Sequence, residues 1–128
     1  MPETAAATTY RIELEAVPGR VAVVIDGVTV ADSADVVVVH ETHLPSVYYF
    51  PPSDVARERF RRSAHRTFCP FKGTATHWSL ELPSRTVDNA AWSYDDPLDA
   101  SNAIGGYVGF YANLVDQWIA DAVDPAAA

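Results

Sequence analysis

The chain has 128 residues, of which 48% are hydrophobic, and its 9 basic and 17 acidic side chains give a formal net charge of −8 at pH 7. This length is enough for one domain with its own core. The acidic balance argues against non-specific binding to nucleic acid or to an anionic membrane surface. No apolar run approaches the roughly 20 residues that a membrane-spanning helix needs.

The N-terminal residues predict a tail rather than a targeting signal. Residues 1–8 are rich in Ala and Thr and show no hydrophobic pattern, so we expect a disordered tail before a single domain at residues 9–124. They lack the basic and apolar regions of a signal peptide. The one cysteine, Cys69, cannot form an intramolecular disulfide. We therefore expect a cytoplasmic protein without disulfides.

The first half of the domain is typical of short antiparallel strands. Apolar and charged side chains alternate at residues 10–16, and β-branched runs follow at 20–25, 28–31, 36–40 and, more briefly, 48–50. Asp26-Gly27 supplies the two positive-φ positions of a tight hairpin turn. Short strands separated by turns favour antiparallel sheets over βαβ units.

Two segments predict helices. Ser53 can cap a short central helix that runs from Asp54 to Arg62. Near the C-terminus, Asn113 and Asp116 have the spacing of a capping box. An apolar stripe with helical spacing follows, made of Leu114, Val115, Trp118, Ile119 and Ala122. The predicted fold class is mainly β, with one short central helix and one C-terminal helix.

The stretch Thr67–Trp78 holds both the single cysteine and the single lysine, Lys72, and it follows a basic segment. Six of the nine basic residues lie within residues 57–72, which indicates either a local anion site or a solvated surface. After Gly73, alternate residues predict a strand with Trp78 on the core face and His77 exposed. If the alternation continues through Gly73, Lys72 lies at the mouth of the core.

Several motifs in a fixed order resemble the family called domain of unknown function 427. They are Glu41, Tyr48-Tyr-Phe-Pro51, Thr67-Phe-Cys-Pro-Phe-Lys-Gly73, Ala91-Trp-Ser-Tyr94 and Gly106-Tyr-Val-Gly-Phe-Tyr111. The resemblance covers roughly residues 10–118. It implies a mainly β fold similar to the Mss4-like β-tent, with two antiparallel sheets. Many β-tents hold a structural zinc ion between two Cys-x-x-Cys motifs, which a single cysteine cannot supply.

This family is also labelled a predicted nucleotidyltransferase, and the residues leave several catalytic roles open. Lys72, Cys69 and Glu41 are the candidates. Lys72 can contact a phosphate or carboxylate, or extend to water from a strand end. Cys69 can be a nucleophile activated by neighbouring cations, or a small buried residue. Glu41 can be an acid–base partner of Lys72, or a carboxylate in a turn.

Metal binding has weak support from the residues. Asp95-Asp96 precedes a proline and is typical of a turn. His40 and His43 have a ligand-like spacing, but the end of a strand offers them poor geometry. We therefore predict no metal site, and the sequence does not identify a cofactor.

The aromatic residues favour a small-molecule site for an anionic or planar ligand. We expect Lys72, Arg66 and Tyr49 to make polar contacts, and Trp92, Tyr94 and Tyr107 to form walls. We expect no nucleic acid or membrane partner. The alternative is a non-catalytic interaction module that docks a protein partner, and a homodimer stays open under either hypothesis.

Overall fold

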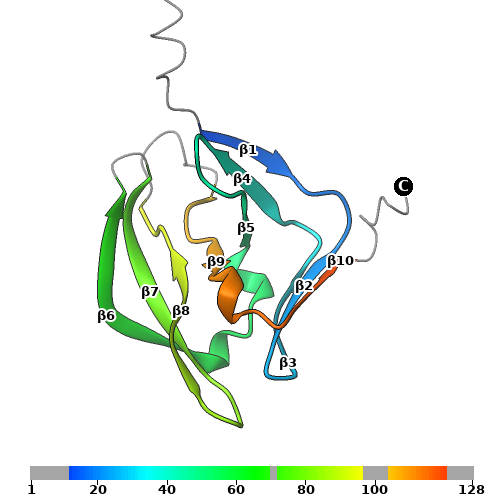
Figure 1. Cartoon of the computed structure of the whole chain (residues 1–128), viewed down its shortest axis with the longest axis vertical. Helices are drawn as coiled ribbons and strands as arrows, with labels where there is room; N and C mark the ends of the chain where they lie inside the picture. The colour runs from blue at the N-terminus through cyan, green and yellow to red at the C-terminus, as the bar shows by residue number, and fades with distance from the viewer. Residues whose placement is uncertain (1–11, 70–71, 97–103, 121–128) are drawn as a thin grey trace, which may run out of the picture.

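Strands in two antiparallel sheets make up most of this computed structural model, which describes residues 12–69, 72–96 and 104–120 (Figure 1). The larger sheet has seven strands in the order β1-β4-β5-β9-β8-β7-β6. Its strands are β1 (Ile12–Ala16), β4 (Val37–Glu41), β5 (Val47–Phe50), β6 (Phe60–Cys69), β7 (Gly73–Glu81), β8 (Thr86–Ser93) and β9 (Val108–Phe110). The smaller sheet has three strands in the order β10-β2-β3, with bounds Gln117–Ala120, Val21–Ile25 and Val28–Ser33.

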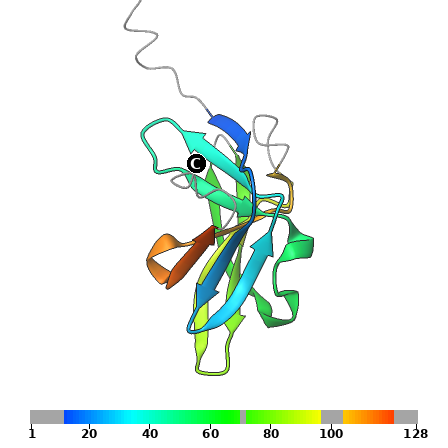
Figure 2. The same ribbon diagram turned by 90° about the vertical axis from the view of Figure 1, so that its right-hand side faces the viewer.

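The main core lies between the two sheets. β2 and β3 contribute buried aliphatic side chains, among them Val23 and Val30, while the larger sheet contributes Phe50, Leu80 and Phe110. Figure 2 shows β2 and β3 lying across the lower part of the larger sheet. Burying each such side chain contributes about 1.5–3 kcal/mol. The prediction of a mainly β fold with two antiparallel sheets is confirmed, while the closer likeness to a β-tent stays a prediction.

A second buried cluster lies on the other face of the larger sheet. It contains Val39, Tyr49, Ala75, Tyr94 and Ile104. Successive residues of a strand point to opposite faces, so β5 sends Tyr49 to this cluster and Phe50 to the main core. The larger sheet is therefore covered on both faces, and the second face positions the candidate site.

The predicted central helix is wrong. Residues Pro52–Asp54 and Arg57–Arg59 form two short 3₁₀ turns, η1 and η2, and β6 begins at Phe60. Ser53 makes no capping hydrogen bond, because the residue before η1 is Pro51. Arg57 and Arg59 bound η2, while Arg61 and Arg62 lie in β6, which is an edge strand of the larger sheet. Charged side chains on an edge strand discourage pairing with another chain.

The predicted C-terminal helix is also wrong. Ala112–Leu114 form a single 3₁₀ turn, η4, and residues from Gln117 continue as β10. There Trp118 pairs with Val23 and Ile119 with Ala22, so tertiary pairing overrides the helical spacing of the apolar residues. Asp116 does not cap a helix, because its carboxylate accepts a hydrogen bond from the backbone N–H of Asp26 at 2.6 Å.

Other details of the prediction have mixed outcomes. The Asp26-Gly27 turn is confirmed, with φ of 51° and 78° at its two residues. The predicted tail at residues 1–8 and the stripe residue Ala122 lie outside the described residues. Across the described ranges, no helix has the length and apolar character needed to cross a bilayer.

Candidate functional site

A pocket of about 380 Å³ lies on the second face of the larger sheet, and we call it the Lys72 pocket. Register places Tyr49, Gly109, Trp92 and His77 in one row across β5, β9, β8 and β7. Directly paired residues of an antiparallel sheet share a face, so this row forms the pocket floor. Besides Tyr49, Trp92 and His77, the pocket is lined by Glu41, Leu44, Pro45, Val47, Thr67, Lys72, Tyr94 and Tyr111.

A buried ion pair closes one side of this pocket. Lys72 Nζ donates a hydrogen bond to Glu41 Oε1, and both side chains are only 7% exposed. The same ammonium lies 5.7 Å from the centre of the Tyr94 ring, within range of a cation–π contact. The Lys72 backbone N–H donates to the carbonyl of Cys69, the last residue of β6, at 3.2 Å.

The floor of the pocket consists of perpendicular aromatic rings. Trp92 Nε1 donates a hydrogen bond to Tyr49 Oη at 3.1 Å, and the two rings lie edge to face with centres 6.0 Å apart. Gly109 lies beneath them, where a Cβ atom would come within 2.9 Å of the Trp92 ring and 3.1 Å of the Tyr49 ring. Only glycine leaves room for both rings against the sheet.

Burial keeps the tyrosines of the pocket neutral. The pKa of Tyr49 and that of Tyr94 are both raised from their ordinary values, chiefly because burial disfavours the phenolate. The pKa of Tyr111, at the rim, is raised for the same reason. Each phenol therefore keeps its proton near neutral pH.

His77 was predicted to be exposed, and that prediction is wrong, because the residue is only 1% exposed. Both faces of β7 are covered, one by the main core and the other by residues around the Lys72 pocket. His77 Nε2 lies 3.0 Å from Thr67 Oγ1, and its ring stacks on Tyr111 with centres 6.2 Å apart. Burial, together with the charges of His65 and Arg66, lowers the pKa of His77. The imidazole is therefore neutral at neutral pH.

Most residues that the sequence singled out meet in this pocket. Five of them line it: Lys72, Glu41, Tyr49, Trp92 and Tyr94. Two more, Cys69 and Tyr107, pack against the same buried cluster without lining the pocket. Arg66 is not brought to the pocket, since it is exposed on β6 and its guanidinium donates to the carbonyls of Ser63 and His65.

The sequence reasoning missed three polar contributors, Thr67, His77 and Tyr111. His77 comes two residues after Ala75, so the two side chains share a face of β7, and a small apolar residue there was a signal that this face is buried. Tyr111 follows directly after β9, where its aromatic neighbours indicated a wall. These three side chains come together in the pocket only because the larger sheet curls, and the periodicity of a strand does not specify how far a sheet curls.

The other polar candidates take structural positions. Asp95 accepts hydrogen bonds from Ser93 at 2.9 Å and from Thr76 at 3.2 Å. His40 interacts with Ser46 and Glu15 instead of joining His43, which occupies a turn with φ of 64°. Within the described ranges, we find no group of three or more His, Cys, Asp and Glu side chains placed to hold a metal ion.

These features define an all-β domain of two antiparallel sheets, with a polar and aromatic pocket on the outer face of the larger sheet. Comparison with protein families gives a match over residues 13–121. The chain belongs to the family described as domain of unknown function 427, whose model also carries the label NTP_transf_9. A search of curated proteins found no match.

Proposed function

We propose that the Lys72 pocket binds a small planar molecule whose edge carries both a hydrogen-bond donor and an acceptor. The observation that carries this proposal is the set of groups lining one pocket: four aromatic side chains, a buried imidazole and a buried ion pair. Its volume of about 380 Å³ falls in the range of roughly 300–1,000 Å³ found for small-molecule sites.

The aromatic groups favour a flat ligand. The rings of Trp92 and Tyr111 lie 4.6 Å apart between centres, and Tyr111 also stacks on His77. Such surfaces bind flat molecules through stacking and edge contacts, each worth about 0.5–1.5 kcal/mol beyond the buried area. Tyr111 is 36% exposed, so part of its ring is open to an entering ligand.

The ion pair favours a ligand whose edge carries both a hydrogen-bond donor and an acceptor over a simple anion. Glu41 neutralises the charge of Lys72, so an anion would have to compete with a carboxylate that is already in place. Together the pair presents an N–H donor and a carboxylate acceptor side by side. A heteroaromatic ring with neighbouring donor and acceptor atoms matches this arrangement. The part of the sequence hypothesis that concerns planar ligands thus has the stronger support.

A nucleotidyltransferase activity rests on the resemblance and on the label of the family. The present proposal concerns binding and assigns no reaction. Cytoplasmic location and the absence of nucleic acid and membrane partners likewise stay predictions from composition and charge.

A thermal-shift screen tests the binding proposal. The compounds are heteroaromatic rings, nucleotides, sugar phosphates and simple carboxylates. A ligand at one hundred times its Kd stabilises the folded state by about 2.7 kcal/mol, which raises the Tm of a domain of this size by about 10 °C. We expect a heteroaromatic compound to give the largest shift. A shift from phosphates and carboxylates alone would contradict the planar assignment.

Two tyrosine variants locate the binding. Tyr111 and Tyr48 are similarly exposed, at 36% and 38%, but only Tyr111 lines the Lys72 pocket. We expect Tyr111→Leu to weaken binding about fivefold to tenfold, because a stacking contact is lost. Tyr48→Leu is the matched control and should leave the Kd unchanged. Equal effects of both variants, or no shift from any compound, would favour the interaction module instead.

A further inference from the structure

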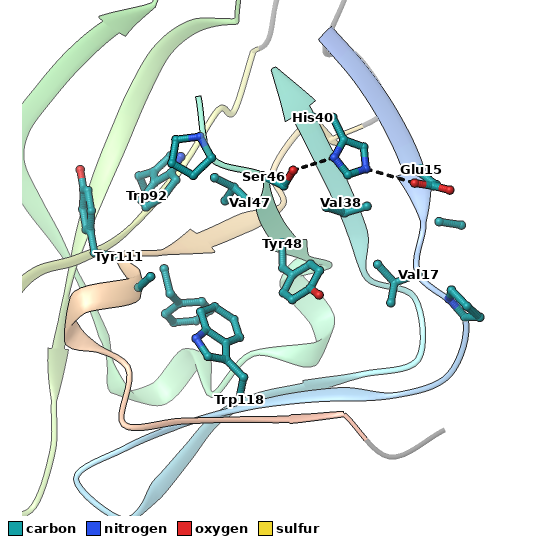
Figure 3. Close-up of a pocket in the computed structure, with 15 residues that line it drawn as sticks. Glu15, Val17, Val38, His40, Ser46, Val47, Tyr48, Trp92, Tyr111 and Trp118 are labelled. Carbon is teal, nitrogen blue, oxygen red and sulfur yellow. Dashed lines mark hydrogen bonds and ion pairs between the residues drawn. The ribbon is translucent and has the colours of Figure 1, made fainter. Parts of the chain in front are cut away.

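A second and larger cavity, of about 650 Å³, lies on the face of the larger sheet that carries the main core. β5 and β9 pair only at Tyr49–Gly109 and Phe50–Val108, and the cavity is lined by residues on both sides of this short pairing. It shares the Trp92 and Tyr111 rings with the Lys72 pocket. Figure 3 shows aromatic and aliphatic side chains around it and three polar side chains at one end.

These three polar side chains come from separate segments that lie side by side. Glu15 is on β1, His40 is on β4, and Ser46 directly precedes β5. His40 Nδ1 lies 2.6 Å from Ser46 Oγ, and His40 Nε2 lies 3.1 Å from Glu15 Oε1 (Figure 3). Since neighbouring residues of a strand face opposite ways, His40 serves this cavity while the next residue, Glu41, serves the Lys72 pocket.

The chemistry of the three groups fixes the roles of the two ring nitrogens. A carboxylate can only accept hydrogen bonds, so Glu15 requires the proton of a neutral imidazole to be on Nε2. Nδ1 then carries a lone pair that accepts the Ser46 hydroxyl proton. In an activated nucleophile, a hydroxyl donates a hydrogen bond to an imidazole, and a carboxylate orients that imidazole. The three groups here have this arrangement. Ser46 is exposed and lines the cavity, so a reacting molecule can reach it.

We propose that Ser46 is a nucleophile for acyl transfer from small aryl esters, with His40 as its general base and Glu15 as a positioning residue. Ser46 Oγ attacks the ester carbonyl carbon while His40 Nδ1 takes the hydroxyl proton. The bond to the aryl oxygen then breaks, and the leaving phenol receives that proton from His40. Water next attacks the acylated Ser46, again with His40 as base, and this releases the carboxylic acid and restores the hydroxyl.

The aromatic lining specifies the aryl group of the substrate. Tyr48 and Trp118 both line the cavity, and their rings meet edge to face with centres 5.7 Å apart. Both remain partly exposed, so each has ring surface left for a flat apolar group. Ser46, Tyr48 and Trp118 line the same cavity (Figure 3), so an ester whose carbonyl lies at Ser46 can direct its aryl group toward the two rings. This inference does not depend on the function proposed for the Lys72 pocket.

Covalent labelling of the full chain tests the proposal. A fluorophosphonate with an aryl group is the probe, and peptide mass spectrometry identifies the modified residue. We expect labelling on Ser46, with loss of that label in Ser46→Ala. His40→Gln should slow labelling about a hundredfold, as expected for removal of a general base. Glu15→Gln should slow it only a fewfold, because this carboxylate is 70% exposed. The rate of phenyl acetate hydrolysis should likewise fall most in Ser46→Ala, less in His40→Gln and least in Glu15→Gln.

Two control variants separate this chemistry from general surface reactivity. Ser53 is exposed on η1 and does not line the cavity, so Ser53→Ala should label as the wild type does. His43 lies in the turn after β4, so His43→Asn should also leave the labelling rate unchanged. Wild-type protein that takes up no probe at Ser46 would overturn the proposal, as would equal rates for wild type and His40→Gln. Ligand binding in the Lys72 pocket should survive Ser46→Ala, so the two proposals fail separately.

Discussion

Lys72 and Glu41 lie 31 residues apart in the sequence and meet as a buried ion pair. In the larger sheet, β5, β9 and β8 separate the strand that ends at Glu41 from the strand that follows Lys72. The contact therefore requires the sheet to curl until the end of β4 and the start of β7 face each other. The pair closes the pocket and ties the two halves of the sheet together.

Removing one partner of this pair should destabilise the fold. Lys72→Met takes the ammonium away from a carboxylate that is only 7% exposed. Breaking a buried ion pair in this way costs about 3–5 kcal/mol. We expect a decrease of about 3 kcal/mol in the free energy of unfolding, measured by urea denaturation.

Two further variants test whether burial is the cause. The double variant Lys72→Met/Glu41→Gln removes both charges, so it should recover a large part of the lost stability. The pair of Arg20 and Asp32 is the surface control, with side chains 56% and 45% exposed. Arg20→Met should change stability by less than about 1 kcal/mol. Equal losses for Lys72→Met and Arg20→Met would contradict this account.

The strands were predictable because their residues have few alternatives. The β-branched runs that became β2, β3 and β4 favour strands, because β-branched side chains lose rotamer freedom in a helix and pack well on a pleated surface. The segment around Trp118 and Ile119 was different, because its apolar residues also fit a helical stripe. This segment became a strand because one edge of β2 was free to form backbone hydrogen bonds with it. Such a choice depends on a strand nearly one hundred residues earlier, so local spacing could not reveal it.

The candidate site was predictable where residues were unusual in themselves. Lys72 stood out as the single lysine, and Trp92 and Tyr94 as closely spaced aromatic residues in the motif Ala91-Trp-Ser-Tyr94. His77 and Tyr111 are not unusual in themselves, and their role depends on a tertiary contact between β7 and the segment after β9. The error for His77 came from assuming that only one face of β7 is buried.

Gly109 should be intolerant of even a methyl group. In Gly109→Ala the new Cβ would lie 2.9 Å from Trp92, closer than such contacts allow, and 3.1 Å from Tyr49, which is unusually tight. Both rings would have to move, and overpacking of this kind costs about 1–3 kcal/mol. We expect lower stability in urea denaturation and a changed near-ultraviolet circular dichroism spectrum.

Gly27→Ala is the control for backbone effects. Gly27 has φ of 78° but no atom within 4 Å of its added Cβ. Alanine there is strained by the backbone alone, which costs about 1 kcal/mol. The near-ultraviolet spectrum should therefore stay that of the wild type. An unchanged near-ultraviolet spectrum in Gly109→Ala would show that the packing of the Trp92 and Tyr49 rings does not depend on Gly109.

Asp26 should titrate at an unusually low pH because of Arg85. Hydrogen bonds from Arg85 and then Ser84 lower the pKa of the Asp26 carboxyl. Because the pKa is lowered, these hydrogen bonds to the ionised carboxylate stabilise the fold. Their contribution is present above the unfolded-state pKa of about 3.9 and is lost as pH falls through the folded-state pKa. Arg85→Gln should raise the pKa of Asp26, followed by its carboxyl NMR resonance. Arg20→Gln, which removes a guanidinium bonded to Asp32, should leave that resonance unchanged.

His77 should make the protein less stable in mild acid. Its pKa is lowered by burial and by the neighbouring charges of His65 and Arg66. The unfolded chain therefore binds a proton at about pH 6.5, while the folded chain does so only at lower pH. Stability must fall as pH decreases from about 6.5 toward the folded pKa, by at most about 1.4 kcal/mol per pH unit. We expect urea denaturation between pH 7 and pH 5 to show this decrease, and His77→Gln to show a smaller one. A ring resonance of His77 that titrates above pH 6.5 would contradict this prediction.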